Sequence, residues 1–333
     1  MKITIRDIAR MTNLSTATVS RVLNNKPDVS EQAREKVMEV IQQHNYNPNS
    51  VARGLALNRT NTIGLILPDI TNPFFPELAR GVESRAKDLG YSVILTDIKN
   101  DNAALIETVD FLRTKQVDGI IIVQWSNSFS KELEQTVNES DLPIVAIDRE
   151  EGKSYVNFDN FSSGYQAAKF LIDQGHVDIG HITGDMATLA AQKRYEGFRN
   201  CLVEHVIPFN EEWIYQGDFT LESGYKGMAT LLGKERKPSA VFAANDMLAI
   251  GAYDAVNDAG LSIPEDISII GHDDISFASI VRPKLTTISV PRYELGMSCV
   301  DALHLLMGKK QKEPQVCNHG GTLSIRDSVR IRI

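Results

Sequence analysis

Polar residues follow directly after short apolar runs in the chain beyond residue 61, and their types suit recognition of a small polar molecule. Carboxylates and amides exchange hydrogen bonds with hydroxyl groups, and charged acceptors form the stronger bonds. If the apolar runs are parallel strands, these side chains gather at the carboxyl ends, where ligands bind in such sheets. The alternative role is structural, and Asp246 is interpreted mainly as a helix cap. The residues are Asp69, Asp148, Asn245, Asp246 and Asp273.

A second set of polar side chains lies near the amino terminus. The stretch ITIRDIARMTNLSTATVSRVLNN repeats apolar residues at helical spacing on both sides of MTNLS, which predicts a helix-turn-helix. Thr4 and Ser15 are placed to cap the two helices, and a third is expected from a Ser30 cap to His44. Spacing alone leaves open a three-helix core with no partner. The polar face of the second helix carries Thr16, Ala17, Thr18, Ser20 and Arg21.

The charge is divided unevenly along the chain. The net charge is −8, yet residues 1–60 carry nine Lys or Arg against five acids, which gives +4 there and leaves −12 for the remainder. Phosphate contacts depend on local positive charge, so only the amino-terminal part is expected to meet a polyanion.

The elements that must position the strand-end residues are short β-rich runs alternating with helical stretches. Nearly continuous apolar strands separated by helices indicate parallel sheets covered on both faces, and two series of them predict two doubly wound α/β lobes. The runs are TIGLILPDI, YSVILTDI, GIIIV and PIVAID in the first series, and IGHITG, WIYQGDF, SAVFAAND and ISIIGHDD in the second.

Composition and missing motifs narrow the classes of function. At 333 residues and 42% apolar, the chain is expected to form two or three units. No apolar run approaches the roughly 20 residues of a membrane span, and no export signal is recognised, so a cytoplasmic protein without a membrane partner is expected. Three widely spaced cysteines indicate reduced thiols.

Catalytic motifs are missing as well. The sequence has no P-loop and no GxSxG, and His176 with His181 lacks the carboxylate of a HExxH motif. We therefore expect no enzyme, no catalytic residue, no metal site and no cofactor.

The stretch IRDIARMTNLSTATVSRVLN, followed by VSEQAREKV and HNYNPNSVARGLA, resembles the head of the lactose-repressor/galactose-repressor family of transcription regulators. The resemblance covers about sixty residues and implies that Thr16, Ala17 and Arg21 face bases in the major groove. Arg21 suits guanine, and Ala17 suits a thymine methyl. Assigned instead to caps and phosphate contacts are Thr4, Ser15, Thr18, Ser20 and Asn24.

Residues 47–60 follow as a hinge. A helix of about eight residues containing Gly54 is too short to be stable alone, so a disordered linker is expected in free protein. The resemblance implies paired hinge helices in the minor groove, with Leu55 wedged between base pairs. Asn49 would cap this helix, with Val51 and Ala52 beside Leu55 on one apolar stripe and Arg53 next to it.

Residues 61–333 resemble the periplasmic sugar-binding fold that this family carries as its sensor, and several stretches are similar to ribose-binding proteins. The resemblance implies a pentose site in which aromatic rings cover the sugar and charged groups bind its hydroxyls. Two departures are Val290, where many relatives have Gln, and His272, which replaces a more usual Phe. The implied effector-binding residues are Asn72, Phe74, Phe75, Asp148, Arg149, Arg194, Phe219, Asn245 and Asp273.

The expected organisation is a helix-turn-helix domain at 1–46, the hinge, and a sensor whose lobes comprise about 61–160 with 291–321 and 162–289 with 322–333. One helix-turn-helix domain contacts only a few base pairs, so a homodimer on a near-palindromic double-stranded operator is expected. A tetramer-forming tail is not expected. The expected function is repression of a carbohydrate-utilisation operon, relieved by a monosaccharide such as ribose. The alternatives are a repressor that needs a purine-type corepressor and a transport-type sugar receptor.

Overall fold

The computed structural model of the protein forms two compact units, residues 1–60 and 61–333. Each is described by itself. The residues that the structure describes are 3–23, 26–44, 46, 59–98, 102–123, 142–147, 155–308 and 316–332.

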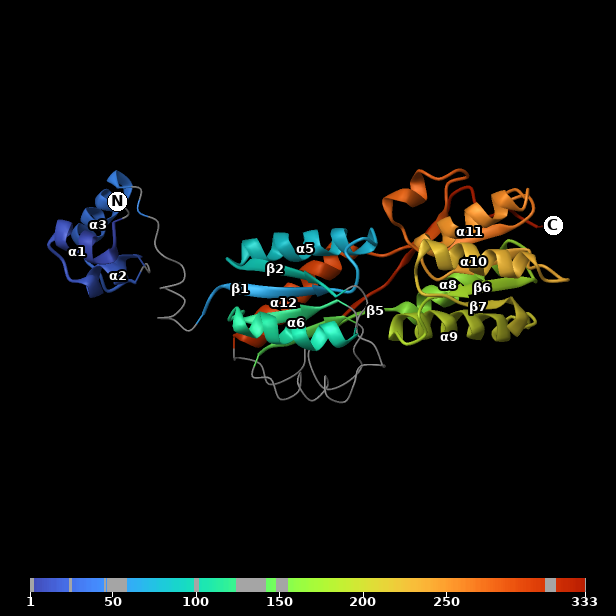
Figure 1. Ribbon diagram of the computed structural model, residues 1–333, viewed down its shortest axis with the longest axis horizontal. Coiled ribbons are helices and arrows are strands. Elements are labelled where there is room, and N and C mark those ends of the chain that lie inside the picture. Colours follow the sequence, from blue (N-terminus) through green and yellow to red (C-terminus); the bar gives the residue numbers. More distant parts are fainter. Residues whose placement is uncertain are drawn as a thin grey trace. The chain divides into compact units, whose positions relative to one another are not determined.

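The described residues of the first unit form three helices, α1 (Ile5–Thr12), α2 (Thr16–Leu23) and α3 (Glu31–Gln43) (Figure 1). The three predicted caps are confirmed. Thr4 forms a reciprocal capping box with Asp7, while the hydroxyls of Ser15 and Ser30 accept the amides of Thr18 and Ala33. The helices enclose a small core of buried side chains, which are Ile8, Ala9, Val19, Val22 and Val37.

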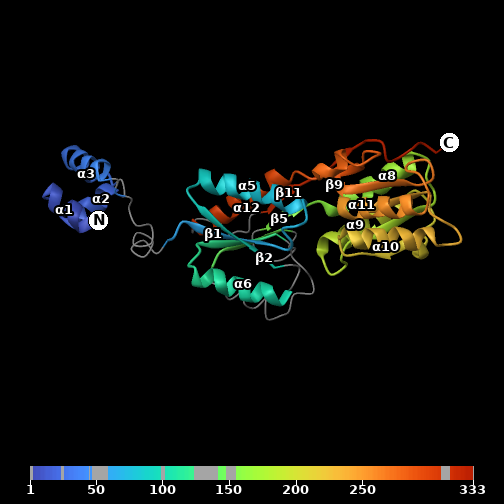
Figure 2. The same cartoon turned by 45° about the horizontal axis from the view of Figure 1, so that its top comes forward.

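The first lobe of the second unit is built on a six-stranded parallel sheet in the order β11-β5-β4-β3-β1-β2. Helices cover both of its faces (Figure 2). Its elements are β1 (Thr62–Leu67), α5 (Phe74–Asp88), β2 (Ser92–Asp97), α6 (Asn102–Thr114), β3 (Gly119–Ile122), β4 (Ile144–Ile147), β5 (Tyr155–Phe158), α12 (Arg292–Met307) and β11 (Val316–His319).

Strand β1 shows why this sheet needs two helical layers. Ile63, Leu65 and Leu67 pack with side chains of α5 and α12, whereas Ile66 packs on the opposite face with side chains of α6. All four are at most 1% exposed, because successive side chains of a strand point to opposite faces and both faces are covered.

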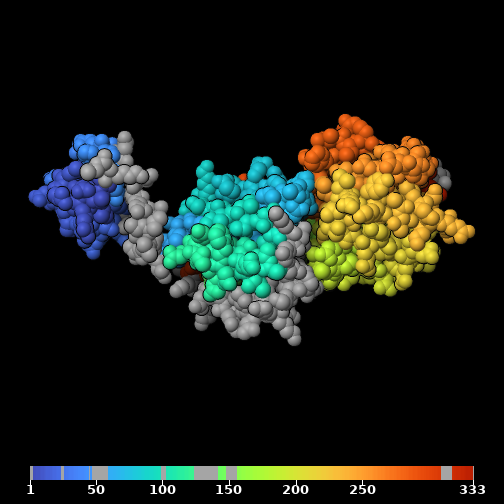
Figure 3. All heavy atoms as spheres, in the orientation of Figure 1, coloured from blue at the N-terminus to red at the C-terminus, as the bar shows by residue number. Residues whose placement is uncertain are grey.

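The second lobe has a six-stranded sheet in the order β12-β10-β9-β8-β6-β7. Its strands are parallel except that β12 runs antiparallel to β10, a departure from the all-parallel prediction. Figure 3 shows the surface of this lobe in yellow and orange. Its elements are α8 (Asn160–Asp173), β6 (Ile179–Thr183), α9 (Leu189–Glu204), η1 (Glu211–Trp213), β7 (Ile214–Gln216), α10 (Leu221–Leu232), β8 (Ala240–Ala243), α11 (Asp246–Asp258), β9 (Ser268–Asp273), η2 (Ser276–Ser279), β10 (Thr286–Ser289) and β12 (Thr322–Ser324).

The described chain passes between the two sheets at three places. It crosses from β5 to α8, from β10 to α12, and from β11 to β12. All eight predicted runs contain a strand, while β5, β10, β11 and β12 were not predicted. These four strands adjoin the crossings, so the crossings depend on the segments with the weakest sequence signal.

Candidate ligand pocket and nucleic-acid interface

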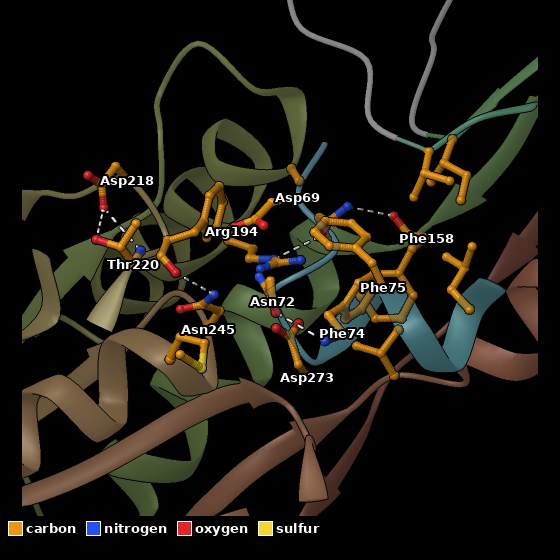
Figure 4. A pocket seen from close by; sticks show the side chains of 18 of the residues that line it. Asp69, Asn72, Phe74, Phe75, Phe158, Arg194, Asp218, Thr220, Asn245 and Asp273 are labelled. Carbon is orange, nitrogen blue, oxygen red and sulfur yellow. Dashed lines mark hydrogen bonds between the residues drawn. The ribbon is translucent and has the colours of Figure 1, made fainter. Parts of the chain in front are cut away.

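A pocket with a cavity volume of about 200 Å³ lies among residues of both lobes, at the carboxyl ends of their strands. Figure 4 shows polar and aromatic side chains converging on it. Asp148 and Arg149 lie outside the described residues, so their predicted place is untested. The predicted residues that line the pocket are Asp69, Asn72, Phe74, Phe75, Arg194, Phe219, Asn245 and Asp273.

Arg194 is a cation held inside the second lobe, 7% exposed. Its Nε donates to Asn160 Oδ1 at 2.8 Å and its Nη1 to the carbonyl of Ala244 at 2.6 Å. The guanidinium carbon lies 5.8 Å from the centre of the Phe219 ring, within cation–π range. These contacts fix the guanidinium where it can bind a polar ligand group without the cost of ordering a free side chain.

Asp273 lies at the end of β9 in a conformation that non-glycine residues rarely adopt. Its φ is 112°, and the φ of Asp274 is 56°. His272 Nδ1 lies 2.9 Å from Asp273 Oδ1, and Asp274 forms an ion pair with Arg326 at 2.6 Å. Backbone strain of this kind persists where surrounding contacts impose it, and such residues cluster at binding sites. The turn therefore directs Asp273 to the pocket while Asp274 is bound elsewhere.

His272 is fully buried and is not among the residues that line the pocket. Burial lowers the pKa of His272 to about 4, and the positive charge of Arg194 lowers it too. Its ring therefore stays neutral at pH 7, where its bond to Asp273 makes it a supporting residue. Val290, the other departure, does line the pocket and adds an apolar surface there.

The interpretation of Asp246 as a helix cap is wrong. The cap of α11 is the preceding residue, Asn245, whose Oδ1 accepts the amide of Leu248 at 2.9 Å. Asp246 is fully buried and accepts instead from the amide of Ile275 at 2.9 Å and the hydroxyl of Thr287 at 2.6 Å. Burial and the nearby charge of Asp273 hold the pKa of Asp246 well above its usual range.

Matching turns contribute to the pocket from each lobe. Asp69 was predicted there as a strand-end residue, whereas Asp218 was missed. Asp69 Oδ1 accepts the amide and the hydroxyl of Thr71 at 2.8 and 2.6 Å. Asp218 Oδ1 does the same for Thr220, at 3.0 and 2.6 Å. The shared signal is the pattern Asp-x-Thr just after a strand, in DIT and DFT. Lining residues that were not predicted include Thr71, Phe158, Asn160, Asp218, Thr220 and Leu295.

Helix α2 of the first unit presents the predicted base-facing side chains to solvent. Thr16, Ala17 and Arg21 are exposed, whereas Val19 and Val22 are buried in the core. The hydroxyls of Ser15 and Thr18 lie 2.8 Å apart, at the amino end of the helix. Asn24, a predicted phosphate contact, lies outside the described residues. So do the residues of the predicted hinge helix, Asn49, Val51, Ala52, Arg53 and Leu55.

Among the described residues, none of the helices combines the length and the apolar composition that a membrane span requires. In the same residues, no group of three or more His, Cys, Asp or Glu side chains is arranged to hold a metal ion.

A helix-turn-helix unit joined to a two-lobed α/β unit with a pocket lined by both lobes defines a ligand-responsive transcription regulator. Residues 4–49 match the bacterial regulatory proteins of the lacI family, and residues 60–319 match the periplasmic binding proteins and sugar binding domain of the LacI family. The chain belongs to the LacI family, which confirms the resemblance and the fold class.

Two relatives by sequence carry different names. The ribose operon repressor of Haemophilus influenzae is 39% identical over 90% of each chain. The HTH-type transcriptional repressor PurR of Actinobacillus pleuropneumoniae is 36% identical over 98% of each chain. Both are named as repressors.

Solved structures of LacI family regulators are also similar to this chain. The lac repressor dimer bound to operator and the anti-inducer ONPF matches 99% of this chain and 100% of that one, with a TM-score of 0.87 and 27% identity. A LacI family regulator from Enterococcus faecium with bound ribose matches 82% of this chain and 100% of that one, with a TM-score of 0.74 and 33% identity.

Proposed function

We propose that this protein is a cytoplasmic repressor that binds a near-palindromic operator as a homodimer and releases it when a pentose enters the pocket. Residues 1–46 are the DNA-binding domain, 47–60 the hinge helix, and 61–333 the sensor with the lobe limits given above. The exposed face of α2 and the lac repressor dimer bound to operator support the DNA-binding role.

The pocket is the observation that most directly supports the proposed ligand. Its volume of about 200 Å³ is below the roughly 300–1,000 Å³ of sites for drug-sized ligands, which favours a small molecule. Phe74 and Phe75 offer apolar rings, while Arg194 and Asp273 offer charged hydrogen-bonding groups to hydroxyls. Ribose is the first candidate, supported by the ribose-bound relative.

A purine-type corepressor is the second candidate, favoured by the PurR relatives that match nearly the whole chain. Calorimetric titration of the purified protein with ribose, other monosaccharides and purine bases distinguishes the two. We expect saturable heat with ribose and none with guanine. Binding of a purine base without ribose binding would replace the first candidate with the second.

The response is tested on the protein–operator complex. We expect sequence-selective binding at moderate salt, weakened by ribose; tighter binding in ribose would contradict induction. A transport-type receptor would form no selective complex. We propose no enzymatic activity, consistent with relatives named as repressors, so bound ribose should be recovered unchanged.

A further inference from the structure

Gly184 and Phe219 are packed in direct contact beside the pocket. Gly184 is buried just after β6, and a methyl group there would overlap the Cζ and Cε1 atoms of the Phe219 ring. The φ of Gly184 lies outside the left-handed region, so its backbone would accept an alanine. The need for glycine at this position therefore comes from the space that the ring occupies.

The backbone of Phe219 is held on both sides. Its φ is 70°, and its carbonyl oxygen accepts a hydrogen bond from Asn245 Nδ2 at 3.1 Å. Asp218 and Thr220 are joined in a turn, and the Thr220 hydroxyl caps α10 by accepting the amide of Ser223 at 3.1 Å. A new group at Gly184 would therefore displace the ring of Phe219 more readily than its main chain.

The displaced ring would affect ligand binding because Phe219 lines the pocket and its ring faces Arg194. A phenyl ring that moved into a cavity of about 200 Å³ would fill a substantial part of it. Movement away from Gly184 would also change the distance between the ring and the guanidinium, which is now 5.8 Å. Both effects alter the surface that a small ligand meets.

We propose that Gly184 determines ligand size: by lacking a side chain, it keeps the Phe219 ring out of the cavity and so leaves room for the effector. Gly184 acts through Phe219 and is a positioning residue. The inference rests on the proposed function, because it concerns the same pocket. Gly184 is not among the residues that line the pocket, so its effect on the ligand passes through the ring.

The test uses full-length Gly184→Ala, titrated with ribose by calorimetry and with operator in the absence of sugar. We expect at least a tenfold loss of ribose affinity, with operator affinity within twofold of the wild type. The matched control is Gly233→Ala in the same lobe, where the nearest atom would be Ala229 O at an ordinary 3.5 Å. This control should bind ribose as the wild type does.

A second variant shows whether the effect passes through the ring. Phe219→Leu removes the atoms that overlap, so adding Gly184→Ala to it should cost less than threefold further in ribose affinity. An equal penalty in both backgrounds would overturn the proposal, as would unchanged ribose binding by Gly184→Ala.

Failure of the ribose assignment is distinguishable from failure of this inference. If the wild type does not bind ribose, the proposed ligand is wrong, and the crystal structure of Gly184→Ala decides the inference without any ligand. A Phe219 ring displaced into the cavity supports it. A ring that stays in place, or a main chain that moves instead, overturns it.

Discussion

The Arg21 guanidinium lies 3.0 Å from the carboxylate of Asp28, and both side chains are more than half exposed. An exposed ion pair adds little stability, so its importance lies in where it directs the guanidinium. Arg21 is the proposed guanine-reading residue, and Asp28 places a negative charge beside it. This carboxylate both orients Arg21 and repels DNA phosphates.

Replacing Asp28 with Asn is expected to tighten binding to any duplex by roughly threefold to tenfold, because one repulsive charge is lost. The substitution should also reduce the preference for operator over a site that lacks the guanine proposed to contact Arg21. Fluorescence anisotropy at fixed salt measures both. The control Glu39→Gln, with the same change in charge on exposed α3, should leave the preference intact; an undiminished preference in D28N would contradict the orienting role.

Replacing Arg194 with Lys is expected to weaken ribose binding by roughly 10- to 100-fold, since hydrogen bonds to charged groups contribute about 1.5–3 kcal/mol. Lysine cannot reproduce the fixed contacts to Asn160 and Ala244. Arg199→Lys is the matched control, because Arg199 lies on the same helix, is exposed, and stacks over Phe209 at 5.5 Å. Equal losses in calorimetric titrations of the two variants would show that the Arg194 contacts have no special role.

Replacing Asp246 with Ala is expected to lower the free energy of unfolding by about 2–4 kcal/mol, because the buried Ile275 amide and Thr287 hydroxyl lose their acceptors. Ribose affinity should fall too, since Ile275 follows the strained turn that carries Asp273. Urea unfolding and calorimetry measure the two effects. Asp258→Ala, at the exposed end of the same helix, should change stability by less than 1 kcal/mol, and a comparable loss there would argue against the buried contacts.

Acid is expected to destabilise the sensor unit. Burial lowers the pKa values of His176, His181 and His272 to about 4 from the ordinary 6.5. Between pH 4 and 6.5 the unfolded chain therefore binds more protons than the folded chain. The stability contributed by the neutral histidines is complete above pH 6.5 and is lost progressively as pH falls towards 4. Urea unfolding followed by circular dichroism from pH 7 to 4.5 should show this decline, with a smaller slope for His272→Phe. A flat profile would contradict the neutral buried imidazoles.

The hinge is tested by changing its helix propensity in opposite directions. Gly54→Ala should tighten operator binding about fivefold per protomer and weaken the response to ribose, because alanine favours a helix by about 1 kcal/mol. Ala52→Gly should do the reverse. Operator titrations with and without ribose measure both, and unchanged binding in the two variants would contradict folding on DNA.

Long apolar runs and capping residues were predictable from the sequence. Strand β1 is continuously apolar because both faces of its sheet are covered, and Thr4, Ser15 and Ser30 each precede a helical repeat. Strands β5 and β11 were not predicted, because each is short and contains an asparagine among its apolar residues, and β11 pairs with a strand far away in the chain.

The pocket was predictable in part. Aromatic and charged residues in recognisable stretches, such as Phe75 and Arg194, do line it. Asn245 and Asp246 are adjacent and of similar capping type, so only packing decides which one caps α11. The role of Gly184 could not be predicted from its neighbours in the sequence, because it depends on the Phe219 ring, 35 positions further along the chain.

The three crossings between the sheets also limit how the lobes can move. A single flexible connection would let one lobe tilt or twist about any axis, whereas three separate connections oppose twisting and leave bending as the easiest motion. Phe158, Asn160 and Val290 adjoin two of the crossings and also line the pocket. A ligand bound there sits near the pivot, so a small change of angle at the pocket becomes a larger displacement at the far end of each lobe.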